Sequence, residues 1–181
     1  MKVVILCTLF ISTLISSNLS TLYKLYETQQ YKRGCDYGFK YLKKNRDSEK
    51  FLTLYGLSCL ETNKIDRIAT PMVKLKNGKA QRENGSYFGT ILLQKQLLKQ
   101  ALLDKKELGK LKLPKTNFVL SKIFNLFVHK RYHLKDDIYI FQDSNNRDIE
   151  YQLYIQKMAT KNYMILDIYK NNKFIKRYRY N

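Results

Sequence analysis

Cys35 and Cys59 are the two residues whose type and spacing most clearly predict chemistry in this chain. The stretch KKNRDSEK between them is polar and predicts a turn centred near Asp47, twelve residues from each cysteine. Two antiparallel helices that meet at this turn bring both cysteines to the same height, and a disulfide then needs Cα atoms within about 6 Å of each other. We therefore predict a Cys35–Cys59 disulfide; two small buried residues on packed helices are the alternative.

The N-terminal segment MKVVILCTLFISTLISS has the three regions of a secretory signal peptide. Lys2 precedes an apolar run from Val3 to Ile15, and small polar residues follow. The run is shorter than the ~20 residues of a membrane-spanning helix. We predict that residues 1–17 are a cleaved signal peptide, so that no transmembrane span remains; the alternative is that the segment is retained as an anchor. A periplasmic or secreted chain that keeps two cysteines favours a disulfide.

The two histidines are the other residues whose spacing suggests a site. His129 and His133 have the i, i+4 spacing of metal ligands on a helix, and Asp136 and Asp137 follow them. A zinc site needs three or four ligands, so we interpret the pair as polar residues near a helix C-terminus. The sequence also contains no nucleophile elbow, phosphate-binding glycine loop or Cys-x-x-Cys motif. We predict a non-catalytic protein without a cofactor or a metal.

The chain is strongly basic, with a net charge of +19 among 181 residues. This charge favours anionic partners, although an AT-rich genome would also enrich lysine. Basic and aromatic residues interleave most closely at the end of the chain, where the candidate polyanion contacts are Lys170, Lys173, Lys176, Arg177 and Arg179. The alternative is that they face solvent and protect an edge strand from aggregation. Export favours an anionic surface or an acidic protein over nucleic acid as the partner.

The residue pattern changes near residue 134. Residues 18–133 have mainly helical periodicity, and residues 134–181 are rich in the β-branched and aromatic residues typical of strands. We therefore predict an α+β fold, with N-terminal antiparallel helical hairpins followed by a small C-terminal antiparallel β-sheet. The sheet is expected to be a meander packed on the last helix, which ends near Val128.

Two local signals predict where elements begin and turn. Ser86 follows a loop with two Asn-Gly pairs and is the predicted N-cap of a new helix. Asn171 and Asn172 predict a two-residue hairpin turn, because asparagine tolerates positive φ angles. Such a turn places Asp167 opposite Lys176, as an oppositely charged cross-strand pair.

The helical part contains a short repeat, because the segment 54–56 (LYG) recurs as the segment 87–89 (YFG). With Ile68 twelve residues after Gly56, and Ala101 twelve after Gly89, residues 19–104 resemble the tetratricopeptide family of helix-turn-helix repeats. The closing proline of that pattern is missing, and Pro71 lies inside the second helix, which it would kink or shorten. The alternative is an irregular helical domain with a chance spacing.

This resemblance implies a scaffold that binds partners on a concave face, although a fold does not fix a function. The candidate partner contacts are Tyr23, Tyr26, Tyr55 and Tyr87, each of which is alternatively a core residue. We predict a protein-interaction scaffold whose partner is an unidentified protein of the cell envelope. The alternative is a basic binder of polyanionic surfaces, which are envelope lipid head groups or nucleic acid.

Overall fold

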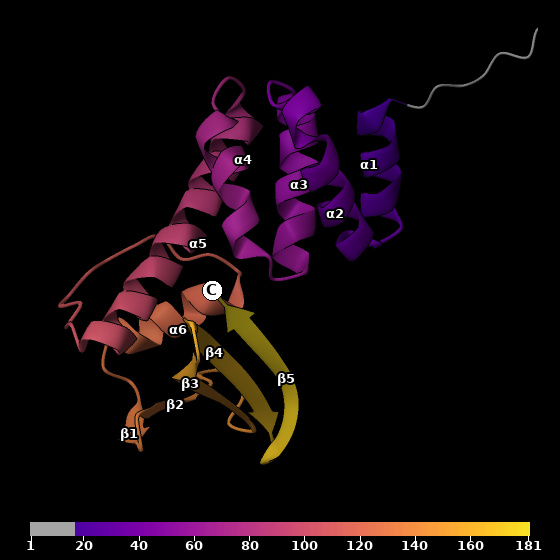
Figure 1. Ribbon diagram of the computed structural model, residues 1–181. Coiled ribbons are helices and arrows are strands. Elements are labelled where there is room, and N and C mark those ends of the chain that lie inside the picture. Colours follow the sequence, from indigo (N-terminus) through magenta and orange to yellow (C-terminus); the bar gives the residue numbers. More distant parts are fainter. Residues whose placement is uncertain (1–16) are drawn as a thin grey trace, which may run out of the picture.

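A computed structural model describes residues 17–181 of the chain. The predicted signal peptide lies outside the described residues except for Ser17, whose hydroxyl caps the first helix by accepting a hydrogen bond from the backbone N–H of Ser20 at 3.2 Å. Helices stand side by side at one end of the molecule, and an antiparallel sheet forms the other end (Figure 1). The predicted α+β fold class is confirmed.

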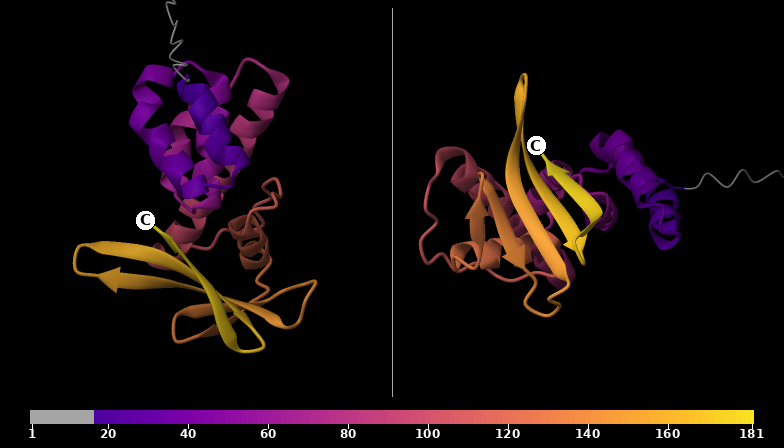
Figure 2. Two further views of the ribbon diagram at one scale, coloured as in Figure 1. Left: turned by 90° about the vertical axis from the view of Figure 1, so that its right-hand side faces the viewer. Right: turned by 90° about the horizontal axis from the view of Figure 1, so that it is seen from below.

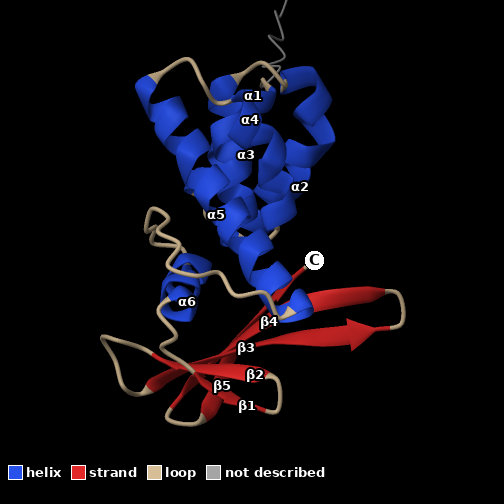
Figure 3. Ribbon diagram, turned by 90° about the vertical axis from the view of Figure 1, so that its left-hand side faces the viewer, coloured by secondary structure: helices blue, strands red, loops and turns tan. Residues whose placement is uncertain are grey.

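Short turns join the first five helices, so consecutive helices pack side by side as antiparallel neighbours. A sixth helix follows a long loop and lies next to the sheet (Figure 3). The helical elements are α1 (Asn18–Glu27), α2 (Tyr31–Tyr41), the 3-10 turn η1 (Leu42–Asn45), α3 (Glu49–Glu61), the 3-10 turn η2 (Ile65–Ile68), α4 (Ala69–Lys74), α5 (Lys79–Asp104) and α6 (Val119–Val128).

Aromatic rings packed on glycines bring neighbouring helices close together. The ring of Tyr55 in α3 covers Gly38 in α2, and the ring of Phe88 in α5 covers Gly56 in α3, so neither glycine has room for a Cβ atom. Both rings are buried in the main core. The pair Tyr55-Gly56 in α3 therefore makes both kinds of contact, with its ring on Gly38 of the preceding helix and its glycine beneath Phe88 of α5.

Helix α5 differs from the sequence-based prediction. The prediction that Ser86 caps a new helix is wrong, because α5 begins at Lys79 and continues through this residue. The good helix formers that follow Gly78 outweigh a single Asn-Gly pair. As a result, Gly89 and Ala101 lie on one continuous helix, and no turn separates them.

Pro71 lies in the first turn of α4, a helix of six residues. Backbone nitrogens of the first turn have no hydrogen-bond partner within the helix, so proline there removes no intrahelical hydrogen bond. The segment expected to form the second helix of this hairpin consists of two pieces, η2 and the short helix α4, and Pro71 lies near the start of the second piece.

The sheet has five antiparallel strands in the order of the sequence. These are β1 (His133–Lys135), β2 (Ile138–Gln142), β3 (Ile149–Met158), β4 (Lys161–Lys170) and β5 (Lys173–Tyr180). The long hairpin of β3 and β4 crosses beneath the helices, and β5 lies at one edge of the sheet (Figure 2). The inner face of the sheet packs on α6, where the ring centroids of Phe127 and Tyr139 are 5.1 Å apart.

The hairpin of β4 and β5 turns at Asn171 and Asn172, which have positive φ angles of 48° and 61°. The turn is thus formed as predicted, but the predicted register is wrong by one residue. A bulge next to the turn shifts the pairing, so that Asp167 lies opposite Arg177 and not opposite Lys176. A bulge adds one unpaired residue to one strand, which a two-residue turn alone does not reveal.

Candidate functional site

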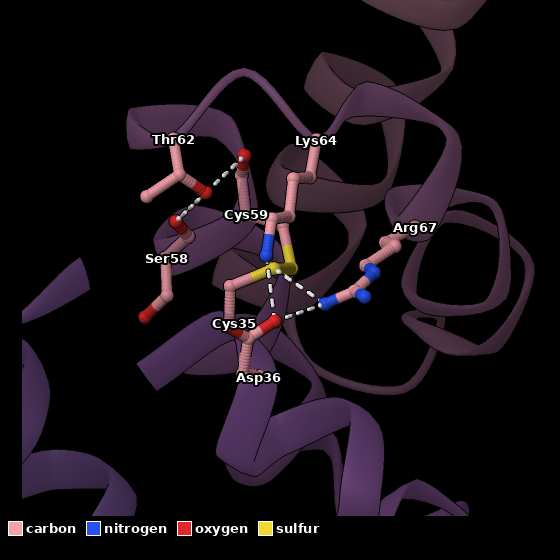
Figure 4. Close-up of a disulfide and its surroundings, with 7 residues drawn as sticks. All are labelled: Cys35, Asp36, Ser58, Cys59, Thr62, Lys64 and Arg67. Atoms are coloured by element: carbon pink, nitrogen blue, oxygen red, sulfur yellow. Dashed lines mark hydrogen bonds and ion pairs between the residues drawn. A yellow bond between two sulfur atoms is a disulfide. The ribbon is translucent and has the colours of Figure 1, made fainter. Parts of the chain in front are cut away.

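Cys35 in α2 and Cys59 in α3 form a disulfide, with 4.8 Å between their Cα atoms (Figure 4). Both residues are buried in the core. The structure thus pairs the two cysteines as predicted, with Asp47 in the turn between the two helices. The turn places the cysteines at the same height because the two helical arms are of equal length.

Ion pairs surround the disulfide and join α2 to the turn after α3 (Figure 4). The carboxylate of Asp36 accepts hydrogen bonds from Lys64 Nζ at 2.6 Å and from Arg67 Nη1 at 2.7 Å. These two hydrogen bonds lower the pKa of Asp36 below its ordinary value. The guanidinium of Arg67 also reaches Cys35 Sγ at 3.6 Å and lies 4.5 Å from the ring centroid of Phe39. Both cations are therefore held in fixed positions.

A cleft of about 560 Å³ lies between the turn after α3 and the C-terminal end of β5. Residues 62–67 form one wall, and Arg177 and residues 179–181 form the other. The side-chain amide of Asn63 donates a hydrogen bond to the backbone oxygen of Arg179 at 3.4 Å, which joins the two walls. We call this the basic cleft, because Lys64, Arg67, Arg177 and Arg179 all line it.

The four cations of the basic cleft are neutralised to different extents. Arg177 donates two hydrogen bonds of 2.7 Å to the buried carboxylate of Asp167, and these raise the pKa of the guanidinium. In the part of the chain that the structure describes, Arg179 has no carboxylate partner. Its guanidinium lies 3.6 Å from the ring centroid of Tyr163. Arg179 is thus the cation of the cleft that is most open to an external anion.

Asp66 is the acidic side chain in the lining of the cleft. Its carboxylate already binds the ammonium of Lys95, a residue of α5 whose side chain is only 2% exposed. This buried cation offsets the charge of Asp66, so the acidic residue does not cancel the positive character of the cleft.

The structure divides the five predicted polyanion contacts. Arg177 and Arg179 line the basic cleft, whereas Lys170 and Lys173 lie opposite each other beside the hairpin turn. Lys176 lies on the other face of β5, 4.6 Å from the ring centroid of Tyr178. The five residues therefore do not share one face of the strand, because alternate residues of a strand point to opposite faces. Lys64 and Arg67 were not predicted, since no local pattern relates them to β5.

Tyr55 is not a surface contact, which corrects one of the four predicted tyrosines. It is 1% exposed beneath α2, and burial raises its pKa to about 12. Tyr23 is exposed and donates a hydrogen bond to Glu27. The position of Tyr55 follows from packing, because its ring covers Gly38 of the neighbouring helix.

Tyr26 and Tyr87 lie near the same acidic residue, although they belong to α1 and α5. Burial is the main cause that raises the pKa of each, and the negative charge of Glu61 adds to both shifts. Tyr87 also donates a hydrogen bond of 2.7 Å to Asn117. Both of these predicted partner contacts are thus partly buried.

The two histidines do not lie on one helix. α6 ends at Val128, His129 caps it with its ring nitrogen 2.7 Å from the backbone oxygen of Asn125, and His133 begins β1. Within residues 17–181, no group of three or more His, Cys, Asp or Glu side chains is arranged to hold a metal ion. No helix of this described part is long and apolar enough to cross a membrane.

Comparisons of the chain with protein-family models, with curated proteins and with solved structures found no match.

Proposed function

We propose that this protein is a non-catalytic, exported interaction scaffold that binds an acidic region of a partner protein in the basic cleft. The observation that carries this proposal is the convergence of four cations from two distant parts of the chain on one cleft of about 560 Å³. A cleft that already has its shape loses less conformational entropy on binding than a flexible surface does.

The ties around the disulfide support this proposal. Lys64 and Arg67 are held by Asp36, and Asp36 follows Cys35 directly in the sequence. The covalent link between α2 and α3 therefore fixes the helical wall of the cleft. A disulfide also favours an oxidising compartment, which agrees with the predicted signal peptide and with a partner in the cell envelope.

A binder of polyanionic surfaces is the second candidate. Arg179 stacked on Tyr163, together with the exposed lysines at 170 and 173, favours it, because stacked and basic side chains suit nucleic acid or lipid head groups. Counterion release makes polyanion binding fall steeply with salt. A protein partner held by shape and a few ion pairs depends on salt much less.

Affinity capture from nuclease-treated envelope extract tests the proposal. The tagged protein is compared with Arg179→Glu and with the matched control Lys50→Glu, which changes the same charge at an exposed position in the first turn of α3. We expect a specific protein to be captured at about 0.15 M salt, and captured by the control, but to be lost with Arg179→Glu.

Two results would contradict the proposal. Capture of lipid or nucleic acid alone, with loss of binding between low and moderate salt, would favour the polyanion binder. Cell fractionation that recovers the protein in the cytoplasm would exclude export.

A further inference from the structure

β5 is an edge strand, and one side of its backbone is unpaired. In the described part of the chain, the backbone of residues 173–180 is hydrogen-bonded to β4, and its one further backbone contact is the hydrogen bond from Asn63 to the oxygen of Arg179. The remaining N–H and C=O groups of this edge are free to pair with another extended chain. Figure 2 shows β5 at the open side of the sheet.

The charges on β5 select what can pair with it. Lys173, Lys176, Arg177 and Arg179 are exposed, and the strand contains no acidic residue. A second copy of the chain would place cations opposite cations, which is unfavourable across paired strands. The net charge of +19 adds a further repulsion between copies. An acidic strand has the complementary charge at each of these positions.

The edge also leads into a site that suits an acidic chain. Its C-terminal end forms one wall of the basic cleft, and the cations of the other wall, Lys64 and Arg67, lie beyond it. At its opposite end, Phe174 and Ile175 are 55% and 53% exposed and offer apolar contacts to an extended chain. The unpaired backbone groups, the cations and the exposed apolar side chains therefore all belong to the same edge strand, β5.

We propose that the free edge of β5 accepts an extended acidic segment of a partner protein as a sixth strand, whose end lies in the basic cleft. This rests on the proposed function and adds the mode of recognition, in which main-chain hydrogen bonds supply affinity and the cations select acidic side chains. The hydrogen bond from Asn63 closes the end of the edge and limits how far the added strand can extend.

A synthetic peptide of eight residues that carries glutamates on both faces of the added strand tests this inference, because it matches the length of β5 and the cations of β5 lie on both faces. The control peptide has the same sequence but carries N-methyl groups on alternate amides, which removes hydrogen-bond donors and keeps the charge. We expect the control to bind at least about tenfold more weakly in titration calorimetry, since several backbone hydrogen bonds are lost. Bound peptide should also slow amide hydrogen exchange in residues 173–180.

A protein variant gives a second readout. Lys173→Glu combined with Lys176→Glu reverses the charge of the edge, and the new carboxylate at position 173 lies opposite Lys170, so folding should be preserved. The matched control reverses the exposed residues Lys110 and Lys112, which lie outside the sheet. We expect peptide binding to weaken at least about tenfold in the first variant and less than about twofold in the second.

The failures are distinguishable. Equal binding of both peptides with unchanged exchange in β5 would overturn strand addition and leave the basic cleft as a charge-based site. If neither peptide binds but heparin or anionic vesicles do, strand addition and the proposed protein partner are both wrong. Self-association of the purified protein through β5, seen by sedimentation, would replace the acidic segment with a second copy.

Discussion

The helical array and the sheet are stabilised by different kinds of interaction. The array relies on aromatic rings packed over glycines and on one covalent link between α2 and α3. The sheet region instead contains two buried carboxylates, Asp143 directly after β2 and Asp167 in β4, and each binds a cation and a tyrosine hydroxyl. This difference predicts that reducing agents act on the array and acid acts on the sheet.

The two carboxylate clusters of the sheet lie on opposite faces. Asp143 accepts hydrogen bonds of 2.6 Å from Lys122 in α6 and from the hydroxyl of Tyr151, so it fixes the helix to the inner face. Asp167 joins Arg177 and Tyr154 on the outer face. An ion pair with a buried carboxylate thus joins the sheet to α6, in addition to the ring packing between them, whereas a covalent bond joins α2 to α3.

Removal of the disulfide should have the largest effect on stability. We expect Cys35→Ala combined with Cys59→Ala to lower the free energy of unfolding by about 3 kcal/mol, because the unfolded chain regains the entropy of a closed loop. Thermal unfolding with and without reductant checks this, and the reductant should affect only the wild type. If removal of the disulfide accelerated amide hydrogen exchange equally in β3 and in α3, the array and the sheet would not be stabilised separately.

Loss of the Asp143 carboxylate should have the next largest effect. Burial acts to raise the pKa of Asp143, but hydrogen bonds from Lys122, Tyr151 and the backbone N–H of Asn145 outweigh it and hold the pKa well below its ordinary value. We expect Asp143→Asn to cost about 2 kcal/mol at neutral pH, as for a hydrogen-bonded buried charge. Chemical denaturation measures the difference.

The pH dependence of this variant has a definite sign. A carboxyl group with a lowered pKa in the folded state stabilises the fold above its unfolded pKa, and this stabilisation is lost as the pH falls through the folded pKa. The difference between the wild type and Asp143→Asn should therefore be complete at neutral pH and decrease below about pH 4. A difference that stays constant from neutral to strongly acidic pH would show that the charge of Asp143 is not the cause.

The Asp167–Arg177 pair should contribute least of the three. The side chains of Lys122 and Arg177 are 41% and 47% exposed, so solvent screens both cations to a similar extent. Asp143 also accepts hydrogen bonds from the backbone N–H groups of Asn145 and Asn146, and within the described residues the carboxylate of Asp167 is bound by side chains alone. We expect Arg177→Met to lower the free energy of unfolding by about 1 kcal/mol in chemical denaturation. The loss in Tyr154→Phe, which removes one neutral hydrogen bond to Asp167, should be smaller. A loss as large as that of Asp143→Asn would mean that the outer face is as important to folding as the inner face.

The sequence by itself determined the class of each element and the covalent link. Helical periodicity and a cluster of strand-forming residues were sufficient for the α+β class, because these patterns follow from which side chains each element buries. Equal distances from Asp47 were sufficient to predict the Cys35–Cys59 pair. The Asn171-Asn172 turn was also predictable, since only a few residue types tolerate positive φ angles.

Details that depend on packing between elements were not predictable from local patterns. The bulge that pairs Asp167 with Arg177 and the uninterrupted course of α5 through Ser86 are two such details. Helix formers after Gly78 continue α5 through a local cap signal, and the bulge adds one unpaired residue that the turn signal does not reveal. The burial of Tyr55 has the same origin, because its position is decided by Gly38 on another helix.

The basic cleft was decided by the tertiary structure alone. Lys64 and Arg67 lie in a turn between helices, and Arg177 and Arg179 lie near the end of the chain, so no spacing in the sequence relates them. They meet because the sheet, which lies next to α5 and α6, is positioned beneath the turn after α3 (Figure 1). Charge composition determined that the protein is basic, and the contacts between helices and sheet determined where that charge forms a site.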